Sequence, residues 1–156
     1  MSTADLAALI EQYRVGLEAE LVLLRRLQGV AGRQHDTAQA TDLDALRRAA
    51  DEREALMSGL MAIEQEIHVI REQLSRGRRA ARRVPGFTHV AGLHENVARI
   101  VKEVLETDRD SIRALEQVVA SRRVAAQALE QAESTLAAYG RMTTPPAAAT
   151  LVNRRG

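Results

Sequence analysis

The chain has 156 residues, of which 46% are hydrophobic, 28% charged and only 2% aromatic, and its formal net charge is +1. A charge so close to zero argues against a domain built mainly to bind nucleic acid, and the absence of cysteine excludes disulfides, thiol catalysis and cysteine-ligated metals. The scarcity of aromatic residues and turn signals argues against a β-sandwich, so we predict one all-α domain with a core of Leu, Ile, Val and Ala.

The first helix is predicted to begin near Thr3, with Asp5 in its first turn, where the helix dipole favours an acid. Apolar residues then recur every three or four positions, as a helix with one buried face requires. These residues are Leu6, Ile10, Tyr13, Leu17, Leu21, Leu24 and Ala31. The pattern fades between Gln34 and Gln39, ahead of a second start signal.

The second helix is predicted to begin at Thr41, a capping hydroxyl that is followed three residues later by the acid Asp44. A seam of residues with helical spacing follows: Leu46, Arg53, Leu56, Leu60, Ile63, Ile67, Ile70 and Leu74. Arg53 interrupts this seam. We expect it to bury its aliphatic stem and to extend its guanidinium into water.

An arginine-rich segment separates the second helix from the third. Its six arginines are Arg71, Arg76, Arg78, Arg79, Arg82 and Arg83. Val84-Pro85-Gly86 then predicts a turn, and Thr88 is expected to cap the next helix. No aromatic residue lies between the arginines to stack on bases. We interpret the cluster as a solvated basic turn, with an acidic protein, an acidic lipid or a nucleic acid as alternative contacts.

The third helix is predicted from Leu93 to Tyr139, a stretch without proline or glycine. At 1.5 Å per residue it would span about 70 Å, so we expect an elongated molecule that works through a helix surface and not through an enclosed pocket. Its predicted apolar face contains Val97, Val101, Val104, Ile112, Leu115, Val119, Ala126, Leu129 and Leu136.

Two charged residues, Asp108 and Arg122, lie near core-facing positions of this third helix. Because a buried unpaired carboxylate is costly, the seam must open or supply a partner, and we predict a kink, a change of partner helix or local exposure near Asp108. Gly140 is expected to end the helix, and the prolines that follow prevent its continuation. The predicted fold is an elongated antiparallel bundle of three long helices over residues 1–140, followed by a disordered tail over residues 141–156.

The predicted third helix carries a second group of apolar residues: Leu115, Val118, Val124 and Ala125. An exposed apolar surface of this kind indicates either a partner helix or self-association. The alternative is that the strip forms the third side of a wider bundle.

No catalytic constellation is evident. The four histidines, His35, His68, His89 and His94, are scattered, and we interpret them as surface or linker residues. Glu66 and Glu95 are only nominal metal ligands. Neither His68 nor His94 is followed by the Lys-Gly common in phosphotransfer bundles, and the chain has no phosphate-binding loop or nucleophile elbow. We therefore predict no enzymatic activity, cofactor, metal or small-molecule substrate.

We also expect a cytoplasmic protein without membrane insertion. The first residues have no basic region followed by an apolar one, so no signal peptide is expected. No stretch approaches the roughly 18 consecutive apolar residues that a membrane span needs.

Two segments give the chain a resemblance to the FlgN-type flagellar export chaperones. The family has a central segment of the type Glu-Lys-x-x-Leu-Leu-x-x-Leu-x-x-Leu-Glu, and residues 51–65 read Asp-Glu-Arg-Glu-Ala-Leu-Met-Ser-Gly-Leu-Met-Ala-Ile-Glu-Gln. Tyr139-Gly140 followed by a short tail also matches, as do the length and the helix layout. The family's Leu-Asn-x-x-Asn in the third helix is replaced here by Leu105-Glu106-Thr107-Asp108-Arg109-Asp110.

This resemblance implies a cytoplasmic chaperone of type III secretion that binds the C-terminal helices of hook–filament junction proteins and delivers them to the export gate and ATPase complex. The implied client surface lies on the C-terminal helix, and Tyr139 aligns with a tyrosine that contacts the gate. The residues that we assign to the client surface are Leu115, Val118, Val119, Val124, Leu129 and Leu136.

Two other functions stay open. The first is a structural coiled-coil scaffold, or another helical hairpin of a secretion system, that forms homo-oligomers through the same strip. The second is a nucleic-acid-associated protein that acts through Arg76 to Arg83.

Overall fold

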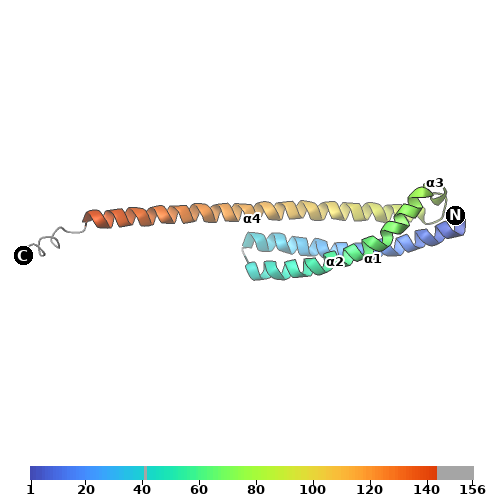
Figure 1. Ribbon diagram of the computed structural model, residues 1–156, viewed down its shortest axis with the longest axis horizontal. Helices are drawn as coiled ribbons and strands as arrows, with labels where there is room; N and C mark the ends of the chain where they lie inside the picture. Colours follow the sequence, from blue (N-terminus) through green and yellow to red (C-terminus); the bar gives the residue numbers. More distant parts are fainter. Residues whose placement is uncertain (41, 144–156) are drawn as a thin grey trace, which may run out of the picture. The chain divides into compact units, whose positions relative to one another are not determined.

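The computed structural model describes residues 1–40 and 42–143, and every regular element in these ranges is a helix (Figure 1). Three helices are long: α1 (Thr3–Ala40), α2 (Leu43–Arg76) and α4 (Phe87–Thr143). A single turn, α3 (Arg78–Ala81), lies between α2 and α4. The all-α prediction is therefore confirmed, with four helices in the described part of the chain where three were expected. The predicted tail lies outside the described residues from position 144 onward.

The connection between α1 and α2 differs from its prediction. Helix α1 continues through the segment where the apolar pattern fades, and Ala38 is buried there. The N-cap of α2 is Asp42, whose extended backbone lets the side chain accept a hydrogen bond from the Ala45 amide at 3.0 Å. Thr41, to which the sequence pattern assigned this role, lies outside the described residues.

Both ends of α4 also differ from their predictions. Gly86 has a φ of +93°, a left-handed conformation that favours glycine, and α4 begins directly after it. Thr88 therefore lies in the first turn of α4 and is not its cap. Gly140 was expected to end the helix, but α4 continues through it to Thr143.

The chain divides into two compact units within α4. Residues 1–115 form unit 1, and unit 2 begins at Glu116. Unit 1 contains α1, α2, α3 and the first half of α4, whereas the described part of unit 2 is the second half of α4 alone. The sequence pattern had placed a single boundary after Gly140.

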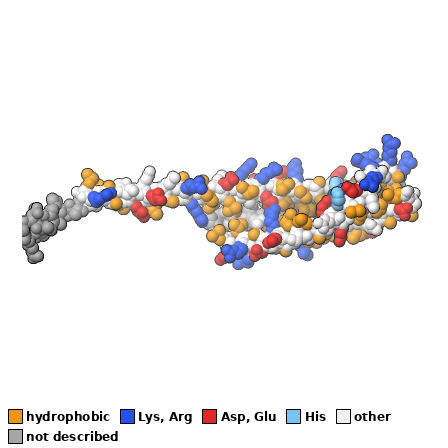
Figure 2. All heavy atoms as spheres, in the orientation of Figure 1, with side chains coloured by type: hydrophobic (Ala, Val, Ile, Leu, Met, Phe, Trp, Pro, Cys, Tyr) orange, Lys and Arg blue, Asp and Glu red, His pale blue; other side chains and the backbone are white. Residues whose placement is uncertain are grey.

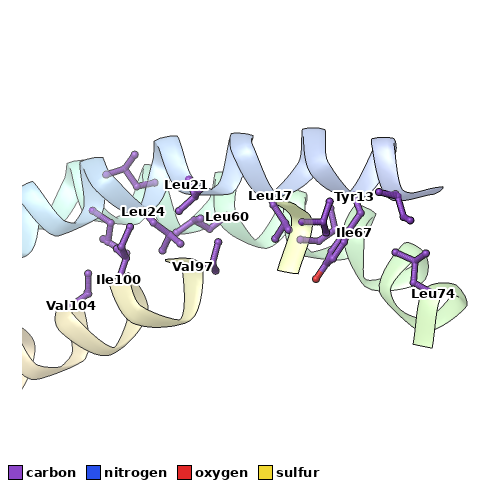
Figure 3. Close-up of a cluster of buried hydrophobic side chains, with 14 of the residues drawn as sticks. Tyr13, Leu17, Leu21, Leu24, Leu60, Ile67, Leu74, Val97, Ile100 and Val104 are labelled. Atoms are coloured by element: carbon purple, nitrogen blue, oxygen red, sulfur yellow. The ribbon is translucent and has the colours of Figure 1, made fainter. Parts of the chain in front are cut away.

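Helix α1 supplies more buried core residues to unit 1 than any other helix. It runs antiparallel to α2, so that Gly16 faces Ile67 near one end and Arg33 pairs with Glu52 near the other. Figure 3 shows side chains of α1, α2 and α4 pointing toward one another. The buried side chains in this layer include Leu17, Leu21, Leu24, Leu60, Ile67, Val97, Ile100 and Val104. Nearly all of these positions belong to the predicted helical seams.

An ion pair connects the two charged residues that interrupt the seams of α2 and α4. Arg53 donates two hydrogen bonds to the Asp108 carboxylate, at 2.7 and 2.6 Å, and a third to Gln34 of α1 at 2.9 Å. The prediction that Arg53 extends into water is therefore wrong. The seam supplies Asp108 with a partner, and α4 continues as one helix through this position.

Candidate functional site

The described part of unit 2 is a helix whose apolar side chains are exposed, except for the half-buried Val118. From Glu116 to Met142 no side chain is buried, and Leu129 and Leu136 are 61% and 71% exposed. Because a helix turns about 100° per residue, these two leucines share one side with Val118, Val119 and Ala126. We call these five residues the exposed strip. The strip also contains two charged residues, Arg122 and Glu133.

The structure places the six residues assigned to the client surface in three environments. Val118, Val119, Leu129 and Leu136 lie together in the exposed strip. Leu115 belongs to unit 1, where it lines a hollow of about 330 Å³ with Leu46 and Ile112. Val124 is 65% exposed but lies about 140° around the helix from Leu129, on the opposite side.

Tyr139, the residue assigned to the export gate, lies near the C-terminal end of α4. Its side chain is 68% exposed. It lies about 80° around the helix from Leu129, on the side away from Val119 and Ala126, so it is outside the exposed strip.

Most of the arginine cluster is exposed, as the sequence predicts for a solvated turn. Figure 2 shows Lys and Arg side chains gathered at the end of unit 1 where α3 lies, and Arg76, Arg78, Arg79, Arg82 and Arg83 are all exposed.

Arg71, the first arginine of the cluster, differs from the others because its side chain contacts residues of α1 and of its own helix α2. Its guanidinium donates to Glu64 at 2.6 Å and to the Tyr13 hydroxyl at 3.1 Å. The hydrogen bond with Glu64 raises the pKa of Arg71 and lowers the pKa of Glu64. The Tyr13 hydroxyl also lies 3.2 Å from Nδ1 of His94 on α4, so this network joins three helices.

The other features that bear on function are negative findings. Within residues 1–40 and 42–143 no three His, Asp or Glu side chains are placed to hold a metal ion together. No helix in these ranges combines the length and the apolar character that a membrane span requires.

An apolar groove lies between α2 and α4, with α1 beneath it, and it was not predicted from the sequence. It has a volume of about 450 Å³. The side chains that line it from the three helices are Glu20, Leu24, Leu27, Arg53, Met57, Leu60, Met61, Glu64, Gln65, Val101, Val104, Leu105 and Asp108. We call it the α2–α4 groove. The one signal in the sequence is the pair Met57 and Met61, one helical turn apart on either side of the buried Leu60.

Glu20 is the acidic residue of the groove that lacks a partner. It is only 9% exposed, and its Oε2 atom is buried with no hydrogen-bond partner among the described residues. Burial raises the pKa of Glu20, and the like charge of Glu64 raises it further, while Arg71 opposes both.

Replacing Glu20 with glutamine is expected to stabilise the protein near neutral pH. Because the folded state raises the pKa of Glu20, it binds this proton more tightly than the unfolded state does, and ionisation costs stability as the pH rises. We expect Glu20→Gln to add about 1 kcal/mol to the free energy of unfolding at pH 7. The gain should disappear below about pH 4, where the carboxyl group is protonated in both states.

Urea unfolding of both proteins at the two pH values measures this difference. The ion pair of Glu64 with Arg71 has the opposite pH dependence, because the pKa of Glu64 is lowered, and it is present in both proteins. If the free energies of unfolding of the two proteins differ by the same amount at both pH values, ionisation of Glu20 does not destabilise the folded state.

No protein-family model, no curated protein and no solved structure matches this chain.

Proposed function

We propose that this chain is a non-enzymatic export chaperone of the FlgN kind. In this proposal it works in the cytoplasm and binds the C-terminal helices of hook–filament junction proteins before their secretion. The proposal combines the resemblance in the central segment and at Tyr139-Gly140 with one observation, the exposed strip of α4.

The exposed strip has the spacing that recognition of a helix requires. Val119, Ala126, Leu129 and Leu136 recur at intervals of seven and three residues, the pattern with which one helix packs against another. Covering a Leu or Val side chain completely contributes roughly 1.5–3 kcal/mol. Val119, Leu129 and Leu136 together therefore contribute several kcal/mol toward association, which suits reversible capture of a client helix.

Delivery requires a second contact, and we assign it to Tyr139. Its side chain is 68% exposed and lies to one side of the strip, so a client helix on the strip does not need to cover it. The proposed partners at this stage are the export gate and the ATPase complex, and the chain acts on the client without chemical change.

Replacing Leu129 with aspartate is expected to weaken client binding by at least about tenfold, because a carboxylate in the centre of the contact must be desolvated. The measurement is the affinity for a peptide from the C-terminal helix of a hook–filament junction protein of the same genome, by calorimetry or fluorescence anisotropy. The helix content should not change, since Leu129 is exposed.

Val124→Asp is the matched control. Val124 is as exposed as Leu129 and lies on the same helix, but on its other side. The control should bind the peptide as the unchanged protein does. If Leu129→Asp also binds normally, the strip is not the client surface.

A further inference from the structure

The second half of α4 carries four charged residues without partners in their own helix. They are Arg122, Arg123, Glu130 and Glu133, all exposed, and no ion pair among the described residues includes any of them. Opposite charges pair along a helix at spacings of three or four residues. At those spacings each of the four meets only an uncharged residue or a like charge. An opposite charge for them can come only from outside this helix.

The exposed strip has the spacing of a coiled coil, with its charges placed symmetrically. Its inward positions recur alternately at three and four residues: Val119, Arg122, Ala126, Leu129, Glu133 and Leu136. The arginine is the second of these positions from one end, and the glutamate is the second from the other end. An antiparallel copy of the same helix therefore brings each basic residue opposite an acidic one.

This antiparallel register has its midpoint between Gln127 and Ala128. The facing pairs are Val119 with Leu136, Arg122 with Glu133, and Ala126 with Leu129. Each of these contacts occurs twice, because the arrangement has a twofold axis through the midpoint. The register covers the exposed Val119, Leu129 and Leu136 of both copies, so the apolar match and the charge match hold together.

A second set of ion pairs lies at the edge of the same contact. Arg123 and Glu130 are seven residues apart and flank the strip on one edge of the helix. A twofold axis between antiparallel helices keeps this edge on the same side in both copies. In the register given above, Arg123 of one copy and Glu130 of the other are offset by only about 3 Å along the helix axis. All four charged residues then have an opposite charge beside them.

Other arrangements of the same two helices leave these charges unpaired. In a parallel pair Arg122 would face Arg122 and Glu133 would face Glu133, which is repulsive. An antiparallel pair shifted by seven residues would set Arg122 against Ala126 or Gly140, according to the direction of the shift. The centred antiparallel register is therefore favoured over these alternatives.

We propose that the second half of α4 forms a twofold antiparallel coiled coil with the same segment of a second copy, centred between Gln127 and Ala128. This one helix supplies the whole contact. A second copy is favoured over a foreign helix because the strip is complementary to itself in both apolar pattern and charge.

This inference does not rest on the proposed chaperone function. The dimer covers the strip, so a client helix and the second copy compete for it. In dilute protein the strip is free, and binding of the client peptide there tests the chaperone proposal separately. As the protein concentration rises and dimers form, the apparent affinity for the peptide should fall.

Sedimentation equilibrium of charge variants tests the ion pairs. Arg122→Glu places two carboxylates together and Glu133→Arg two guanidinium groups, so each variant should dimerise at least about tenfold more weakly than the unchanged protein. The double variant exchanges the two charges and should regain the affinity of the unchanged protein. Gln131→Arg is the control, because it adds a positive charge about 160° around the helix from Glu133 and should dimerise normally.

Disulfide cross-linking tests the orientation, because the chain has no cysteine of its own. In a mixture of Val119→Cys with Leu136→Cys the two thiols face each other and should cross-link under mild oxidation. In either variant alone the two thiols are about 25 Å apart along the axis and should not cross-link. Both replaced side chains are exposed, so the helix content by circular dichroism should not change.

Three results would overturn the proposal. They are a monomer at every concentration, a double variant that dimerises no better than the single ones, and cross-linking of either cysteine variant alone that is as fast as in the mixture. The last result would indicate a parallel pair.

Discussion

Replacing Gly16 with alanine is expected to destabilise the protein by about 1–3 kcal/mol, because the added methyl group would overlap Cγ2 of Ile67. Ile67 is only 2% exposed, and as a β-branched residue in a helix it has one strongly preferred rotamer. The side chain therefore cannot turn away, and α1 and α2 must separate to admit the methyl group. Gly16 is the position where these two helices need a residue without a side chain.

Gly29→Ala is the matched control on the same helix. An added Cβ at Gly29 has no neighbouring atom within 4 Å, so the substitution only improves helix propensity and should stabilise the protein by up to about 1 kcal/mol. Thermal and urea unfolding followed by circular dichroism measure both changes. If Gly16→Ala stabilises the protein as Gly29→Ala does, then α1 and α2 do not approach each other as closely at Gly16 as described here.

Replacing Asp108 with alanine is expected to cost about 1–3 kcal/mol of stability. The substitution leaves the Arg53 guanidinium without the carboxylate that receives two of its hydrogen bonds. The loss should be smaller than the 3–5 kcal/mol typical of a fully buried pair, because Arg53 and Asp108 are 26% and 22% exposed and water screens the charge that remains.

A double-mutant cycle with Arg53→Met, Asp108→Leu and the combined variant isolates this pair. The combined variant should be close to the unchanged protein in stability, because it removes both charges and leaves neither unpaired. The exposed pair of Arg33 and Glu52 is the control, and its coupling energy should stay below about 1 kcal/mol. Equal coupling energies for the two pairs would contradict the structural role of Arg53 and Asp108.

The helices and most of the core could be predicted from the sequence because helical periodicity is a local property. Leu17, Leu60 and Val104 belong to repeats of three and four residues that identify the buried side of each helix. The partner of Arg53 could not be predicted in this way, since it lies 55 residues away and depends on which helices face each other. Sequence spacing shows that a charged residue interrupts an apolar seam, but it does not show which residue of opposite charge pairs with it.

The candidate site was predicted only in part. Leu129 and Leu136 were assigned to the client surface and lie together in the exposed strip, and Val124 was assigned to the same surface because it forms an adjacent apolar pair with Ala125. The 100° turn per residue places it elsewhere. The groove was missed because apolar residues at the edge of a seam, such as Met57 and Leu105, have the same pattern whether or not a further helix covers them.

The most direct test of the account is the accessibility of residue 129. The chain has no cysteine, so Leu129→Cys introduces a single thiol whose alkylation rate can be measured. In dilute protein it should react as fast as Val124→Cys and far faster than Leu24→Cys, which lies in the core, and a client peptide should slow it selectively. If Leu129→Cys reacts as slowly as Leu24→Cys at every protein concentration, the strip is covered within the protomer and the account is contradicted.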